Sequence, residues 1–160
     1  MKVAVYAVGK LKRGVETELC DRYIERINGQ GRAQAIGPVT LTELSESPAT
    51  KAIARKAEEA DALLARISKE ACIVALDERG KARSSIDFTN KIKAMQDDGI
   101  GEIAFVLGGP DGHGDALKNA AHQIIGFGPM TLPHGLARVI LLEQVYRAIT
   151  ILAGHPYHRV

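Results

Sequence analysis

Short apolar runs alternate along this chain with longer segments in which apolar residues recur about every 3.6 positions. The runs have the length and content of buried strands, and the segments between them have the spacing of helices. The expected strands are Val3–Val8, Val39–Leu44, Cys72–Leu76, Glu102–Leu107 and a short one that opens Gln123–Leu132. This alternation predicts an α/β fold, with a mostly parallel sheet covered by helices on both faces.

Start and stop signals mark the boundaries of the expected helices. Asn28-Gly29 stops the first helical segment, and Ser84 with Asp87 resembles a capping box that opens a later one. A polar loop, Asp77–Arg83, is expected before that later helix. The expected helices are Val15–Ile27, Pro48–Ile67, Ser84–Asp97, Asp115–Ala121 and Leu136–Ala153.

Length and composition favour one globular domain spanning residues 1–160. A chain of 160 residues with 46% hydrophobic residues can bury a sizeable core but has little room for a second. It shows no signal peptide and no apolar run of about 20 residues, so a cytoplasmic protein without a membrane span is expected. Cys20 and Cys72 have no CxxC partner and are expected to be reduced core thiols.

In a parallel sheet of this kind, ligands bind at the carboxyl ends of the strands. That rule marks the loops after Leu76 and after Leu107, together with the segment Phe127–Leu132. The second loop, Gly108–Gly112, is either a plain tight turn or a place where backbone approaches a ligand closely. It is neither a phosphate loop nor a dinucleotide fingerprint, because it lacks both glycine patterns.

The segment Phe127–His134 is irregular yet apolar, because two prolines and a glycine interrupt it. It is either a buried crossover from strand to helix or a wall whose backbone groups bind a flat heterocycle such as adenine.

The last expected helix is apolar on most of its circumference, which is typical of a helix buried on several sides. One of those sides is expected to face a second subunit. Glu143, Arg147 and Thr150 form a narrow polar stripe on it. This stripe is either an ordinary ion pair between positions i and i+4 or the lining of a site.

The tail His155–Arg159 gathers titratable, aromatic and cationic groups, which suit stacking on a base and binding of its phosphate. A frayed terminus is the alternative. No third ligand lies near His155 and His158, so no metal is expected. Two basic clusters follow strands at the same edge of the sheet and could hold RNA phosphates; they are Lys10, Lys12 and Arg13, and Arg79, Lys81 and Arg83.

Four segments, Leu107–Gly112, Thr131–His134, Glu143–Ala148 and His155–Arg159, together resemble the SPOUT superfamily of RNA methyltransferases. The resemblance spans the chain and is weakest over residues 28–50. It implies a C-terminal trefoil knot, a homodimer, S-adenosylmethionine as cofactor, and methylation of N3 of a pseudouridine in 23S ribosomal RNA. The cofactor-binding positions that it implies are Leu76, Gly108, Gly109, Phe127, Gly128, Pro129, Met130, Thr131 and Leu132.

For that reaction the enzyme has to align the methyl group with N3 and help the imide proton to leave. His158 and Tyr157 are the candidates for this help, whereas Arg147 and Arg159 would stabilise the uracil anion or hold a phosphate. The near-neutral net charge of +2 favours the assembled ribosome over naked RNA as substrate. The alternative is a non-catalytic RNA-binding or ribosome-associated module that uses the same loops and tail without a cofactor.

Overall fold

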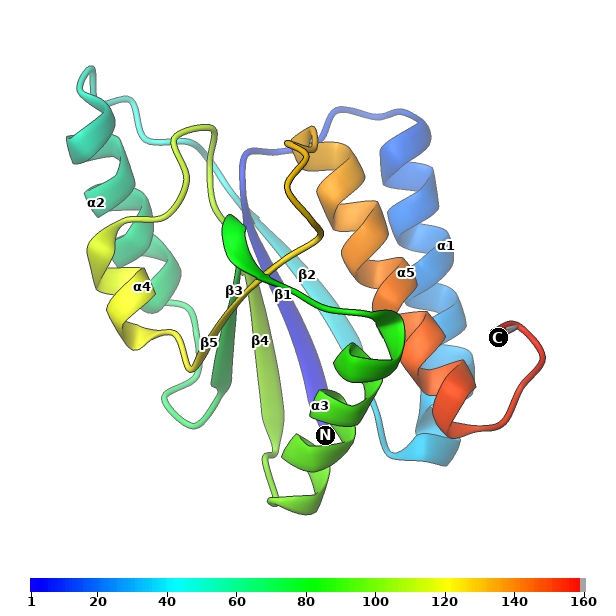
Figure 1. The fold of residues 1–160 in the computed structure, drawn as a ribbon. Coiled ribbons are helices and arrows are strands. Elements are labelled where there is room, and N and C mark those ends of the chain that lie inside the picture. Colours follow the sequence, from blue (N-terminus) through cyan, green and yellow to red (C-terminus); the bar gives the residue numbers. More distant parts are fainter. Residues whose placement is uncertain (159–160) are drawn as a thin grey trace.

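Five parallel strands form the centre of the structure, a computed structural model that describes residues 1–158 (Figure 1). Their order across the sheet is β2-β1-β4-β3-β5, and every neighbouring pair is parallel. The strands are β1 (Lys2–Val8), β2 (Val39–Leu44), β3 (Cys72–Ala82), β4 (Glu102–Leu107) and β5 (Gln123–Gly126). The predicted α/β fold is therefore confirmed.

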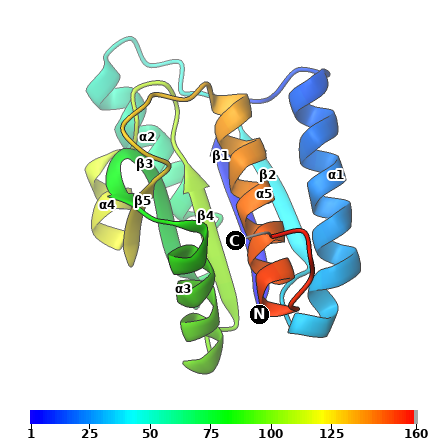
Figure 2. The same cartoon turned by 45° about the vertical axis from the view of Figure 1, so that its right-hand side comes forward.

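Helices cover both faces of this sheet, as the alternating pattern predicts (Figures 1 and 2). The helices α1 (Val15–Gln30), α3 (Ser85–Asp97) and α5 (His134–Leu152) lie on one face, with α5 between the other two. The helices α2 (Ala52–Leu64) and α4 (Asp115–Ala120) lie on the other face.

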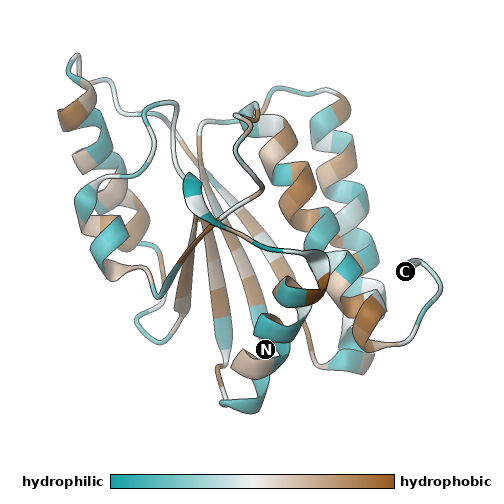
Figure 3. Cartoon of the chain, in the orientation of Figure 1, coloured by the Kyte–Doolittle hydropathy of each residue, from teal (hydrophilic) through white to brown (hydrophobic). Residues whose placement is uncertain are grey.

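The two faces bury separate apolar clusters because successive side chains of a strand point to opposite sides. In β4, Ile103 and Phe105 join the cluster under α1, α3 and α5, whereas Ala104 and Val106 join the one under α2 and α4. Apolar colours accordingly follow the strands and α5 in Figure 3. No helix among residues 1–158 is long and apolar enough to cross a membrane.

The predicted polar loop Asp77–Arg83 is wrong over most of its length, because β3 continues to Ala82. The register shifts between Leu76 and Lys81, after which Lys81 pairs with Ile125 and Ala82 with Gly126. Pairing with β5 overrides the polar composition of this stretch. A Cβ on Gly80 would lie 2.4 Å from the carbonyl carbon of Ile125, so glycine permits this close pairing.

Helix boundaries also differ from the prediction, mostly in the first two helices, of which the second ends at Leu64 and not at Ile67. The first helix continues past Asn28 to Gln30, because the Asn28 side chain accepts from the Val39 amide at 2.8 Å and so serves the strand. The second begins at Ala52 rather than Pro48. The predicted N-cap is confirmed: Ser84 caps α3 and its hydroxyl accepts from the Asp87 amide at 3.1 Å, whereas the Asp87 carboxylate lies 2.8 Å from that same hydroxyl and not on the Ser84 amide as in a full capping box.

Candidate functional site

A cavity of about 310 Å³ lies at the carboxyl ends of β3, β4 and β5, and we call it the strand-end cavity. The three loops that the strand-end rule selects meet there. The predicted cofactor positions that line it are Leu76, Gly108, Gly109, Phe127, Gly128, Met130, Thr131 and Leu132. Pro129 instead lines a neighbouring cavity of about 340 Å³, on the side of α3 and α5, which we call the helix-side cavity.

The Gly108–Gly112 segment is a tight turn and also one wall of the strand-end cavity. The Gly112 amide donates to the Gly109 carbonyl at 2.9 Å, and Gly112 has a φ of +81°, which favours glycine. A Cβ on Gly108 would lie 3.0 Å from the Gly112 carbonyl carbon and 3.1 Å from His113 Nδ1. Any side chain at position 108 would therefore require the turn or His113 to shift by a few tenths of an ångström.

His113 is a buried residue of the site to which the sequence gave no role. It is 3% exposed, and its Nε2 lies 2.8 Å from the Leu76 carbonyl oxygen. Burial lowers the pKa of His113 below its ordinary 6.5, so the ring is neutral at neutral pH and donates through Nε2. Its Nδ1 has no hydrogen-bond partner within residues 1–158. His113 thus joins the end of β3 to the glycine turn, two walls of the cavity.

Charged side chains of both signs surround the strand-end cavity. Its cations are Lys56, Arg79 and Lys118, and its acids are Asp77, Glu78 and Asp111. Arg55 donates to Asp111 at 2.7 Å, and this hydrogen bond holds the pKa of the Asp111 carboxyl below its usual value. Across the cavity, the Thr131 hydroxyl donates to Glu78 at 2.9 Å and ties the Phe127–Leu132 segment to β3.

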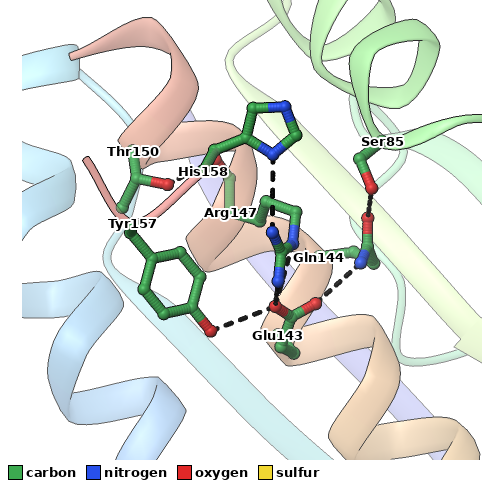
Figure 4. A network of polar contacts seen from close by, with 7 residues as sticks. All are labelled: Ser85, Glu143, Gln144, Arg147, Thr150, Tyr157 and His158. Carbon is green, nitrogen blue, oxygen red and sulfur yellow. Dashed lines mark hydrogen bonds and ion pairs between the residues drawn. The ribbon is translucent and has the colours of Figure 1, made fainter. Parts of the chain in front are cut away.

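The tail turns back at Gly154, whose φ is +65°, and packs on its own helix α5 (Figure 1). The ring of Tyr157 meets the ring of Tyr146 edge-on at 4.9 Å between centroids, and its hydroxyl donates to Glu143 at 3.1 Å. Arg147 donates to the same carboxylate from Nε at 2.9 Å and also from Nη2. The polar stripe and the tail therefore form one network (Figure 4).

This network fixes the protonation of two of its members. Burial, with hydrogen bonds to Tyr23 and Glu143, raises the pKa of Tyr157 well above 10.0, so the phenol remains a donor. The hydrogen bond to Glu143 raises the pKa of Arg147 further. Arginine has no acceptor, so the 3.4 Å contact between Arg147 Nη1 and His158 Nδ1 requires Nδ1 to accept.

Thr150, the third residue of the polar stripe, is fully buried, and its hydroxyl donates to the Arg147 carbonyl at 2.7 Å. A hydroxyl in a helix often satisfies itself on its own backbone in this way. Of the two interpretations of the stripe, a site lining therefore does not apply to Thr150. Arg159 lies outside the described residues, and its predicted role stays a prediction.

The tail network and the strand-end cavity do not meet within one chain. Ala137 lines the cavity, and Arg147 lies ten residues further along the same helix. At 1.5 Å per residue, that is about 15 Å along the axis of α5. Of the basic clusters, Arg79 lines the strand-end cavity and Arg83 lines the helix-side cavity, whereas Lys10, Lys12 and Arg13 follow β1 and line neither.

A part-buried ion pair that the sequence did not reveal joins α5 to this edge of the sheet. Arg138 of α5 is 1% exposed and pairs with Glu43 at the end of β2. It also donates to the Val8 carbonyl at 3.1 Å and to the Gly9 carbonyl. An arginine flanked by apolar residues on both sides in a helix is a signal that could have found it, because a buried cation needs an acceptor.

Within residues 1–158, no group of three or more His, Cys, Asp or Glu side chains is arranged so that it could hold a metal ion. His155 Nδ1 instead accepts from the Tyr157 amide at 3.1 Å.

Comparison with known proteins identifies the family. The family model "Predicted SPOUT methyltransferase" matches residues 1–158. Proteins named ribosomal RNA large subunit methyltransferase H from Bradyrhizobium diazoefficiens and Xanthobacter autotrophicus are 49% and 46% identical to this chain, over 99% of it and of each relative. Among solved structures, the SpoU methyltransferase AviRb from Streptomyces viridochromogenes is 13% identical with a TM-score of 0.46; the match covers 96% of this chain and 61% of that one. The match over residues 1–158 and the near-complete overlap with relatives close to half identical show that the chain belongs to the SPOUT methyltransferase family.

Proposed function

We propose that this protein transfers a methyl group from S-adenosylmethionine to N3 of a pseudouridine in 23S ribosomal RNA, acting in the cytoplasm on the assembled ribosome. The relatives' name supports a ribosomal RNA substrate. The observation that carries the proposal is the pairing of a donor, Arg147 Nη1, with an acceptor, His158 Nδ1, at 3.4 Å in the tail network.

The imide edge of a uracil ring presents a carbonyl oxygen beside the N3–H group. Arg147 can donate to that carbonyl, and His158 Nδ1 can accept the N3 proton once Arg147 Nη1 has turned to the carbonyl. Tyr157 cannot be the base, because its raised pKa keeps the phenol protonated at neutral pH. His158 is therefore the proposed base, and Arg147 the group that stabilises the negative charge on the imide.

The strand-end cavity fits the cofactor. Glycine at position 109 lets the turn that forms one wall pack closely on the protein behind it: a Cβ there would lie 2.7 Å from Glu59 and 3.2 Å from Val8. Apolar walls suit an adenine ring, and acidic and basic side chains are both present for the amino and carboxylate groups. S-adenosylmethionine would supply an electrophilic sulfonium methyl group, and Leu76, Gly108 and the Phe127–Leu132 segment would hold the cofactor.

A homodimer would bring the two halves of the site together. The tail network lies about 15 Å from the strand-end cavity along α5, so the tail of one subunit would serve the cavity of its partner. Apolar surface suited to this contact lies next to the cavity: Leu136 is 42% exposed and Met130 79%. A symmetric pair would bury it.

A labelled-methyl transfer assay tests the proposed function directly. We expect transfer to assembled ribosomes, and less transfer to isolated subunits or to free 23S ribosomal RNA. The product nucleoside should be 3-methylpseudouridine by mass spectrometry. Calorimetry with S-adenosylmethionine separates this function from a non-catalytic RNA-binding module, which would not bind the cofactor.

A further inference from the structure

The tail network extends beyond the tail and reaches the helix-side cavity (Figure 4). That cavity shares the wall Ile125–Gly128 with the strand-end cavity, and Ser85 and Gln144 contribute polar groups to its lining. The Ser85 hydroxyl lies 2.8 Å from Gln144 Oε1, and Gln144 Nε2 lies 2.7 Å from Glu143 Oε2. A continuous line of hydrogen bonds therefore joins the N-terminus of α3 to the tail.

Only one orientation of the Gln144 amide satisfies both neighbours. A carboxylate can only accept, so the amide nitrogen must face Glu143, and the amide oxygen then accepts from Ser85. If the amide were turned over, two acceptors would meet at 2.7 Å. Glu143 therefore sets which way the amide faces, and the hydrogen bond from Ser85 anchors the other end of the Gln144 side chain.

Glu143 in turn has both oxygens engaged. Its Oε2 accepts from Gln144, and its Oε1 accepts from Tyr157 and from Nε and Nη2 of Arg147. This fixes the plane of the carboxylate, and with it the plane of the guanidinium group that pairs with it. Arg147 Nη1 is then the nitrogen that faces His158.

We propose that Gln144, held by Ser85, is a positioning residue that sets the alignment of Arg147 and His158 for the reaction. This inference rests on the proposed function for its kinetic consequence. Without Gln144, Glu143 Oε2 loses its only donor among the described residues, so the carboxylate is held through Oε1 alone and can pivot about it, which changes the plane of the guanidinium group paired with it. Misalignment of catalytic groups by a fraction of their contact distance lowers turnover strongly.

Kinetics of matched variants test this role. Gln144→Leu keeps the approximate size of the side chain and removes both hydrogen bonds. We expect its turnover to fall by about 10- to 100-fold with cofactor affinity within about twofold. Ser85→Ala should lower turnover by about 3- to 10-fold. The double variant should match Gln144→Leu alone within about twofold, because Ser85 acts only through Gln144.

Gln96→Leu is the matched control. It makes the same chemical change on α3, where the amide donates to the Gln34 carbonyl at 2.9 Å, outside the network. Its turnover should stay within about twofold of wild type. If Gln144→Leu does not fold, Ser85→Ala carries the same measurements.

The nitrogen signals of the His158 ring give a second readout that does not depend on methyl transfer. In the wild-type protein His158 should appear as the tautomer with the proton on Nε2 and a hydrogen-bonded Nδ1. In Gln144→Leu the Nδ1 signal should lose its hydrogen-bond shift. An unchanged His158 signal, or turnover equal to that of Gln96→Leu, would overturn the proposal. If the wild-type protein methylates no ribosomal RNA, the proposed function fails and the His158 signal alone decides the positioning role.

Discussion

At the scale of single residues, His113 makes the stability of the protein depend on pH. Its folded pKa is lowered below 6.5 by burial, whereas in the unfolded chain it returns to about 6.5. As the pH falls below that value, the unfolded state binds a proton that the folded state does not, so stability is lost. The charges that act on this ring are Asp77 and Lys118.

His113→Gln should therefore reduce the loss of stability on acidification. Glutamine can still donate to the Leu76 carbonyl but does not titrate. Between about pH 7.5 and pH 5.5, urea unfolding should show up to about 1.4 kcal/mol less loss for the variant than for wild type. His113→Leu should share this gain but bind S-adenosylmethionine more weakly, because it no longer orients Leu76. Equal loss in wild type and His113→Gln would show that the ring takes up a proton in the fold as readily as in the unfolded chain.

Gly108 influences the shape of the strand-end cavity, because it lies in the glycine turn that forms one of its walls. Gly108→Val places its side chain against Gly112 and His113, so the turn must move and the strand-end cavity must change shape. We expect calorimetric affinity for S-adenosylmethionine to fall at least tenfold, roughly 1.4 kcal/mol. The control is Gly101→Val before β4, where an added Cβ would meet no other atom within 4 Å. Unchanged affinity in Gly108→Val would place the cofactor elsewhere.

At the scale of elements, the tail is separable from the cofactor cavity. Its described residues contact α5, and none of them lines the strand-end cavity. Deleting residues 155–160 should therefore preserve folding and cofactor affinity, whereas turnover on ribosomes should fall by about 10²- to 10⁴-fold. His158→Ala should lower turnover with little change in affinity. Near-normal methylation by the truncated protein would show that the tail is a frayed end, and Arg147 would then be the candidate catalytic residue.

Elements with a strong internal pattern could be predicted from the sequence. β2 and β4 have the predicted bounds, and α3 begins at its predicted N-cap. The extension of β3 to Ala82 could not be predicted, because it depends on pairing with a strand more than forty residues away. The site could likewise be predicted only in part. The rule that ligands bind at the carboxyl ends of strands predicted where the cavity lies, but the buried contacts of His113 and Arg138 exist only after the chain has folded.

At the scale of the whole molecule, α5 connects the surface expected to form the dimer with the catalytic network. Leu136 lies in its first turn and is 42% exposed, beside the half-buried Val139 and Ile140. A carboxylate in such a contact would be buried without a partner. Ile140→Asp should give a monomer by light scattering at micromolar concentration. Its affinity for S-adenosylmethionine should be retained, because Ile140 lies outside the strand-end cavity. A wild-type protein that is itself monomeric under these conditions would contradict the dimer.

Mixing two inactive variants distinguishes a shared site from one built within a single chain. Gly108→Val lacks a working cofactor cavity, and the protein without residues 155–160 lacks the tail. If the tail of one subunit serves the cavity of the other, a mixed dimer contains one intact site, formed by the cavity of the truncated subunit and the tail of its partner. Random pairing makes half of the dimers mixed, so about a quarter of the wild-type activity should return after the two proteins are refolded together. If each tail serves its own chain, every site in the mixture lacks one part. The mixture would then stay as inactive as its components, and the 15 Å between tail and cavity would have to be closed by a rearrangement within one subunit.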